Sequence, residues 1–239
     1  MRSKLHFLLL FFFVFNIIYS QKIFKAINDQ DIDKISKILE KGEDINVRGE
    51  NGITPLFTAT GTGNLKIVNL LLSKGADANI EMKSKGTALH MASQEGFTQI
   101  AKSLLENKAN ANKQDLNGWT PLIYASRNGK LDIVKLLVDN GAAIDTKAND
   151  RATALAIAVA KNNTHIARYL LDKGANVNNL DKDNETPVMY CASGGKAEML
   201  NLLLKYNPDL TITNNAGKSV LDIAKERSYD QITIILQGK

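Results

Sequence analysis

A short phrase that opens on a hydroxyl residue recurs along this chain every 33 residues, and this interval constrains the fold more than any other feature. The hydroxyls are those of Thr54, Thr87, Thr120, Thr153, Thr186 and Ser219. Most copies continue with an apolar stretch, a glycine, a Leu-rich stretch and a second glycine. A period of this length is typical of repeat arrays, in which each unit is one supersecondary motif. We therefore expect similar units that bury their apolar faces against their neighbours.

Each unit is predicted to contain two helices. Thr120-Pro121 is typical of a helix start, because the hydroxyl can accept a bond from an orphan amide and proline needs no donor there. The first helix is expected to end at a residue that tolerates a left-handed backbone, namely Gly63, Gly96, Gly129, Asn162 or Gly195. A second, amphipathic helix follows, with apolar residues at helical spacing, and it ends near Gly75, Gly141 or Gly174.

The phrase resembles the ankyrin repeat, whose Thr-Pro-Leu-His-x-Ala signature is best matched by residues 87–92 and 120–125. The resemblance covers residues 21–239 and implies an all-α fold, an ankyrin-repeat solenoid of helix-turn-helix units joined by β-turn or hairpin loops. It predicts seven repeats, of which the first and last are caps with a polar outer face. Their approximate ranges are 21–48, 49–81, 82–114, 115–147, 148–180, 181–213 and 214–239.

Residues 1–20 have the pattern of a secretory signal peptide. Arg2 and Lys4 precede an apolar run from Leu5 to Ile18, and the small Ser20 suits a cleavage site. The alternative is an uncleaved membrane anchor, but the run is shorter than the roughly 20 residues that a spanning helix needs. We expect cleavage, and no stable membrane span after it. The Lys-, Asn- and Ile-rich composition suits an AT-rich genome and favours a bacterial setting over a eukaryotic secretory one. In that setting we expect a periplasmic protein rather than a fully secreted one.

The charge gives no support for nucleic-acid binding. The formal net charge is +5, and loss of Arg2 and Lys4 with the leader would lower it to +3. The remaining basic residues are scattered along the repeats and form no stripe that could follow a phosphate backbone. Whether the glycosylation patterns at Asn162 and Asn184 are used is left open by the sequence.

No group of residues forms a catalytic, cofactor or metal site in this reading. Outside the leader the histidines are His90 and His165, and more than two repeats separate them. The family resemblance implies that His90 ties the turn to the helix start. Asp115 and Asp181 occupy turn positions, where Asp bonds its own backbone. Cys191 replaces an alanine that is buried in other repeats, so we expect it in the core. We predict a protein that is not an enzyme and needs no cofactor.

The resemblance implies that partners bind a concave face formed by turn tips and first helices. Trp119 is the only tryptophan in the chain, and Trp, Tyr and Arg are common hot-spot residues. Small residues in the next repeat, Ala152, Ala156 and Ala160, suggest a shallow apolar depression beside it. The alternative, that Trp119 only packs against the next turn, stays open. The candidate binding residues are Trp119, Tyr124, Arg127, Asn128, Asn117, Gln94, Glu95, Lys83, Tyr190, Lys182 and Glu185.

These observations favour an exported, monomeric module that binds a protein partner as a scaffold, inhibitor or protector. Two alternatives stay open: an accessory or protective subunit of an exported stress or redox enzyme, and an exported effector or toxin-neutralising protein. The sequence names neither the partner nor the pathway. Among the inner repeats, 148–180 departs most from the pattern, at Arg151, Ala154 and Asn162, and we expect it to open first.

Overall fold

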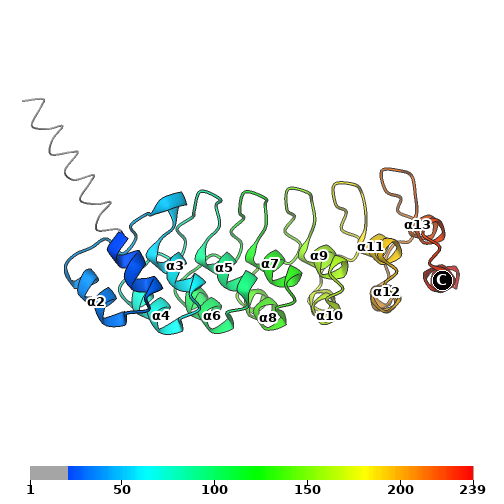
Figure 1. The fold of residues 1–239 in the computed structure, drawn as a ribbon. Coiled ribbons are helices and arrows are strands. Elements are labelled where there is room, and N and C mark those ends of the chain that lie inside the picture. The colour runs from blue at the N-terminus through cyan, green and yellow to red at the C-terminus, as the bar shows by residue number, and fades with distance from the viewer. Residues whose placement is uncertain (1–20, 239) are drawn as a thin grey trace, which may run out of the picture. The chain divides into compact units, whose positions relative to one another are not determined.

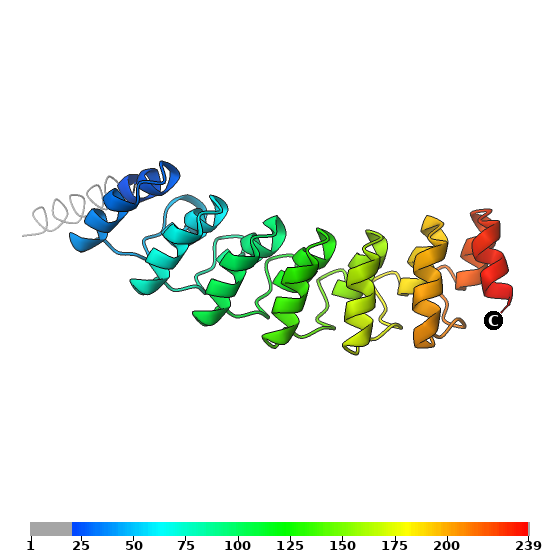
Figure 2. The same cartoon turned by 90° about the horizontal axis from the view of Figure 1, so that it is seen from below.

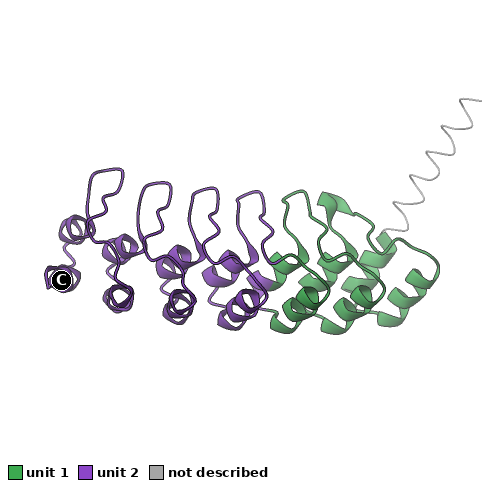
Figure 3. Ribbon diagram, turned by 180° about the vertical axis from the view of Figure 1, so that it is seen from behind, with its two compact units in different colours: residues 1–92, 97–110 green, residues 93–96, 111–239 purple. Residues whose placement is uncertain are grey.

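A computed structural model describes residues 21–238, which form two compact units (Figure 3). Unit 1 contains the described residues up to Ala92 together with Phe97–Asn110. Unit 2 contains Ser93–Gly96 together with the described residues from Ala111 onward. The predicted signal peptide, residues 1–20, lies outside the described residues.

Both units consist of helix pairs joined by turns, so the predicted all-α solenoid fold is confirmed. Unit 1 contains helix 21–28, α2 (Ile32–Glu40), η1 (Glu50–Gly52), α3 (Pro55–Gly61), α4 (Leu65–Ser73), most of α5 (Ala88–Glu95) and α6 (Thr98–Glu106). Unit 2 contains α7 (Pro121–Arg127), α8 (Leu131–Asp139), α9 (Ala154–Ala160), α10 (Thr164–Asp172), α11 (Pro187–Gly194), α12 (Ala197–Leu203), η2 (Leu204–Tyr206), α13 (Val220–Glu226) and α14 (Asp230–Gln237). Among residues 21–238 the one isolated β-bridge joins Thr213 and Ser219.

The helices of unit 2 form two layers. The first helices of the pairs, α7, α9, α11 and α13, lie in one layer, and the turns project beyond that layer (Figure 1). The second helices lie side by side in the other layer, as the view from below shows (Figure 2). Successive first helices contact one another, so α9 packs between α7 and α11. None of the described helices is long and apolar enough to cross a membrane.

The helix starts are those that the sequence predicts. Thr120 caps α7, and its Oγ1 accepts a hydrogen bond from the backbone N–H of Ile123 at 3.3 Å while Pro121 takes the first helical position. Thr153 caps α9 in the same way through the N–H of Ala156, although no proline follows it. The hydroxyl rather than the proline is therefore the shared element of the start.

In each of the four repeats between residues 82 and 213, three positions have a left-handed backbone, with φ between +50° and +93°. Two of them end the helices, as predicted for Gly129 and Gly141, and the third lies in the turn before the capping hydroxyl. At this third position Gly118 has φ +74°, but Arg151 has φ +62° and Lys85 has φ +58°. A residue with a Cβ is strained in this conformation by roughly 1–2 kcal/mol. The repeat therefore fixes the backbone even where the sequence does not supply glycine.

Neighbouring repeats are joined by apolar packing and by a recurring asparagine. Ile133, Leu137 and Leu170 are completely buried in unit 2. Asn112 accepts a hydrogen bond from the N–H of Ala143 at 2.7 Å and donates one to the carbonyl of Gly141 at 3.0 Å. Asn79 does the same in unit 1. Because one side chain satisfies a donor and an acceptor of the next turn, it also fixes the distance between the two repeats.

Candidate protein-binding face

The turn 115–119 of unit 2 is built around one carboxylate. Asp115 Oδ1 accepts hydrogen bonds from the backbone N–H groups of Asn117 and Trp119, each at 2.8 Å. The backbone N–H of Asp115 donates to the carbonyl of Trp119 at 3.0 Å, which closes the turn. Gly118 adopts the left-handed backbone conformation in this turn. The turn therefore holds Trp119 in a defined position immediately before the capping Thr120.

Helix α7 brings two more side chains to the tryptophan. Tyr124 and Arg127 are three residues apart and therefore lie on one side of the helix. The rings of Trp119 and Tyr124 meet edge to face, with centroids 5.1 Å apart and planes at 63°. Arg127 Cζ lies over the Trp119 ring, 5.2 Å from its centroid. The indole thus has an aromatic neighbour in a favoured edge-to-face arrangement and a cation over its electron-rich ring.

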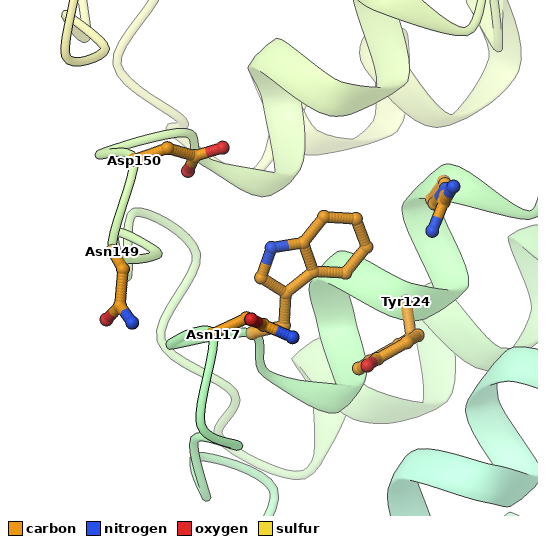
Figure 4. Close-up of a pocket in the computed structure, with 6 residues that line it drawn as sticks. Asn117, Tyr124, Asn149 and Asp150 are labelled. Atoms are coloured by element: carbon orange, nitrogen blue, oxygen red, sulfur yellow. The ribbon is translucent and has the colours of Figure 1, made fainter. Parts of the chain in front are cut away.

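The next turn completes a depression of about 340 Å³. The backbone N–H of Asn149 donates to the carbonyl of Asn117 at 2.9 Å, and the Asn149 side chain donates to the carbonyl of Leu116 at 2.8 Å. Figure 4 shows Asn117, Tyr124, Asn149 and Asp150 around this depression. Its lining residues are Asn117, Trp119, Tyr124, Arg127, Asn149 and Asp150.

The Tyr124 hydroxyl is held by the carboxylate of the preceding turn. It donates to Asp115 Oδ2 at 2.8 Å, so both oxygens of this carboxylate accept hydrogen bonds. Burial, followed by the hydrogen bond and the charge of Asp115, raises the pKa of Tyr124 to about 12. Tyr190 and Asp181 repeat the arrangement two repeats later, and burial and Asp181 also raise the pKa of Tyr190. Both tyrosines therefore stay neutral at physiological pH and have their rings fixed.

The structure brings together four of the predicted binding residues: Asn117, Trp119, Tyr124 and Arg127. Asn128, which follows Arg127 in the chain, does not line the depression. Its side-chain amide donates a hydrogen bond to the backbone carbonyl of Tyr124 at 3.1 Å. The other predicted residues do not line the depression. Their contacts are a side-chain hydrogen bond between Gln94 and Glu95, an ion pair between Lys182 and Asp183, a hydrogen bond from Asn214 to Glu185, and a backbone bond from Lys83 to Asn51.

The prediction that Ala152, Ala156 and Ala160 form an apolar part of the depression is wrong. Ala152 and Ala156 are each 4% exposed and, like Ala160, they are not among the lining residues. Asn149 and Asp150 take that side of the depression instead. The sequence analysis missed these two residues, although they lie 33 positions after Leu116 and Asn117 and are therefore the corresponding turn tip of the next repeat.

His90 and Cys191, which the sequence predicts to have structural roles, are both buried. His90 is buried, and its Nδ1 faces both the N–H and the hydroxyl of Thr87, at 3.1 and 2.9 Å. Cys191 is completely buried, and burial raises the pKa of its thiol to about 12, which keeps it protonated and unreactive. Residues 21–238 contain no cluster of His, Cys, Asp or Glu side chains suited to a metal ion.

Comparison with known families agrees with the helix pairs and the recurring turns. A family model described as ankyrin repeats (3 copies) matches residues 23–115 and 99–181, and a second, ankyrin repeats (many copies), matches residues 170–224. The chain belongs to the ankyrin repeat family. Comparison with curated protein sequences gives no significant match. Ankyrin repeats are generally protein-protein interaction modules and are typically not enzymes.

Proposed function

We propose that this ankyrin repeat protein is an exported, non-enzymatic module that binds a protein partner through the turns and first helices of unit 2, with Trp119 at the centre of the contact. One observation carries the proposal. Trp119, Tyr124 and Arg127, the three residue types most common in interface hot spots, converge on the same depression in one repeat.

The local packing favours binding because it lowers the entropy cost of association. The Tyr124 hydroxyl is fixed by Asp115, and Trp119 is fixed by its turn and its two neighbours. Side chains that are already ordered lose little freedom when a partner arrives. Around them Asn117, Arg127 and Asn149 are exposed, and Leu116 at the turn tip keeps 56% of its surface exposed. Polar groups and an apolar tip thus surround the ordered aromatic pair.

Export rests on the signal-peptide pattern of residues 1–20, and a bacterial periplasm is the favoured compartment. In this proposal the leader is removed, the mature chain has no membrane anchor and acts as a monomer, and nucleic acid is not its partner. The predicted repeat boundaries, with the mature chain starting near residue 21, belong to the same proposal. Amino-terminal sequencing and the mass of the exported protein would test the cleavage directly.

Affinity capture from the native compartment tests the binding face. We expect Trp119→Ala and Arg127→Gln to lose the captured partner while they melt within a few degrees of the wild type. Tyr229→Ala is the matched control, because Tyr229 is another exposed aromatic of unit 2, at 38%, outside the depression. Equal capture by all variants, or loss of capture only in variants that melt early, would show that Trp119 serves packing alone.

A further inference from the structure

Arg127 is the strongest unused hydrogen-bonding group of the depression. It is exposed, it lies over the Trp119 ring, and no hydrogen bond or ion pair joins its guanidinium to any other described residue. A guanidinium held against an aromatic ring keeps its N–H donors available and ordered. This arrangement suits a carboxylate, which can accept two parallel bonds from one guanidinium.

The acidic groups near the depression are more fully occupied. Both oxygens of Asp115 accept hydrogen bonds from its own turn and from Tyr124. Asp150 Oδ1 accepts a bond from the N–H of Ala152 at 3.1 Å, within the turn that Asp150 helps to form. The carboxylates therefore stabilise turns, whereas the cation faces solvent with its donors free. Charge complementarity at this point calls for an anion.

We propose that the partner places an aspartate or glutamate side chain against Arg127 and an adjacent apolar or aromatic side chain against Trp119, so that the occupant of the depression is a protein segment in which an acidic residue neighbours an apolar or aromatic one. This inference rests on the proposed function and adds the chemistry of the partner. The exposed Leu116 at the same turn extends the apolar part of the contact beyond the tryptophan.

Selection from a library of random twelve-residue peptides tests the inference on the purified protein. Because Trp119 is the only tryptophan, its fluorescence reports binding of each selected tryptophan-free peptide at the depression itself. Peptides whose binding needs Trp119 are expected to carry Asp or Glu next to an apolar or aromatic residue. Their affinity should fall about tenfold or more with Arg127→Gln, less with Arg127→Lys, and markedly with added salt.

Arg168→Gln on the outer helix α10 is the matched control, because Arg168 is also exposed and lies on a second helix. The control should bind all peptides like the wild type. Selected peptides that are rich in Lys or Arg and weakened by Asp150→Asn would overturn the inference, and so would Trp119-dependent peptides with no charge preference. In either case the binding face itself would stand.

Failure of the proposed function has a different signature. If no selected peptide depends on Trp119 but capture of the native partner does, the acidic-segment inference is wrong and the binding face is right. If neither peptides nor native partner depend on Trp119, both are wrong. Melting curves of every variant separate these outcomes from unfolding.

Discussion

Two adjacent repeats of unit 2, 115–147 and 148–180, have the same backbone and different surfaces. Gly118 and Arg151 occupy the same turn position with φ +74° and +62°, and Gly129 and Asn162 end the first helices with φ +70° and +59°. Thr120 and Thr153 cap those helices with bonds of equal length, 3.3 Å. The capping residues and the packing between repeats thus impose one conformation, and a non-glycine residue takes it with strain.

The difference lies in the side chains that the shared backbone leaves free. In repeat 115–147, Asp115 bonds two backbone N–H groups and Tyr124. In repeat 148–180 the corresponding residues are Ala148 and Ile157, and Asp150 bonds a single N–H. The first repeat therefore carries an ordered aromatic cluster, while the second contributes only its turn tip to the same depression. The proposed binding face therefore depends on a few positions that the fold does not require.

The largest expected effect is at Gly118. A Cβ there would lie 2.7 Å from both the backbone N and the side-chain Oδ1 of Asn149, in addition to the left-handed strain. We expect Gly118→Ala to lower the free energy of unfolding by about 2–4 kcal/mol, from the combined cost of strain and overpacking. Urea denaturation measures this change in the free energy of unfolding. Arg151→Ala, at the equivalent position, already has a Cβ in place and should change stability by less than about 0.5 kcal/mol. Equal losses would mean that the two turns are not equivalent.

Removal of the turn carboxylates should give the next largest difference. Asp115→Ala leaves two turn N–H groups and the Tyr124 hydroxyl without their acceptor, and we expect a loss of about 2 kcal/mol. Asp150→Ala removes one bond and should cost about 0.5–1 kcal/mol. Urea denaturation measures both losses of unfolding free energy. Trp119 fluorescence should shift in Asp115→Ala and stay unchanged in Asp150→Ala. If the two losses were equal, the extra bonds of Asp115 would contribute nothing to stability.

Most of the fold could be predicted from the sequence because its local rules are strict. A hydroxyl before an apolar stretch caps a helix, and Gly129 or Gly141 tolerates the left-handed end, so the 33-residue interval locates the helix pairs in advance. Arg151 illustrates the limit of these rules. Its residue type predicts no positive φ, and only the neighbouring turns impose one.

The lining of the candidate site was predicted in part, for a related reason. Trp119, Tyr124 and Arg127 stand out because the repeat does not need them, and their spacing places them together on a turn and a helix. Asn149 and Asp150 are ordinary turn residues, so their types give no hint of a site, and only the contact between two turns makes them lining residues. The bond from Tyr124 to Asp115 joins residues nine positions apart through a turn whose closure cannot be read from composition.

Relief of strain at Arg151 should give a smaller effect of opposite sign. Arg151→Gly removes the left-handed strain of a Cβ and adds conformational entropy to the unfolded chain, so we expect a net gain of about 0.5–1 kcal/mol. Hydrogen exchange should then show slower opening of α9 and α10. In the unmodified protein these helices should exchange faster than α7 and α8, as the departures at Arg151, Ala154 and Asn162 predict. Equal protection of the two helix pairs would contradict the comparison of the two repeats.

Alkaline titration should give the most specific difference between the two repeats. The folded protein raises the pKa of Tyr124 from 10.0 to about 12, so between these values the unfolded chain releases a proton that the folded chain retains. The stability that this pKa difference gives to the folded protein is complete below pH 10 and is lost as pH rises through 12. Tyr124→Phe should cost about 1 kcal/mol near neutral pH and make stability decline less steeply above pH 10. Ile157 holds the equivalent position in repeat 148–180, so Ile157→Val, which removes no titrating group, is the matched control and should leave the slope unchanged. Parallel curves for wild type and Tyr124→Phe would show that the Tyr124–Asp115 bond does not persist in solution.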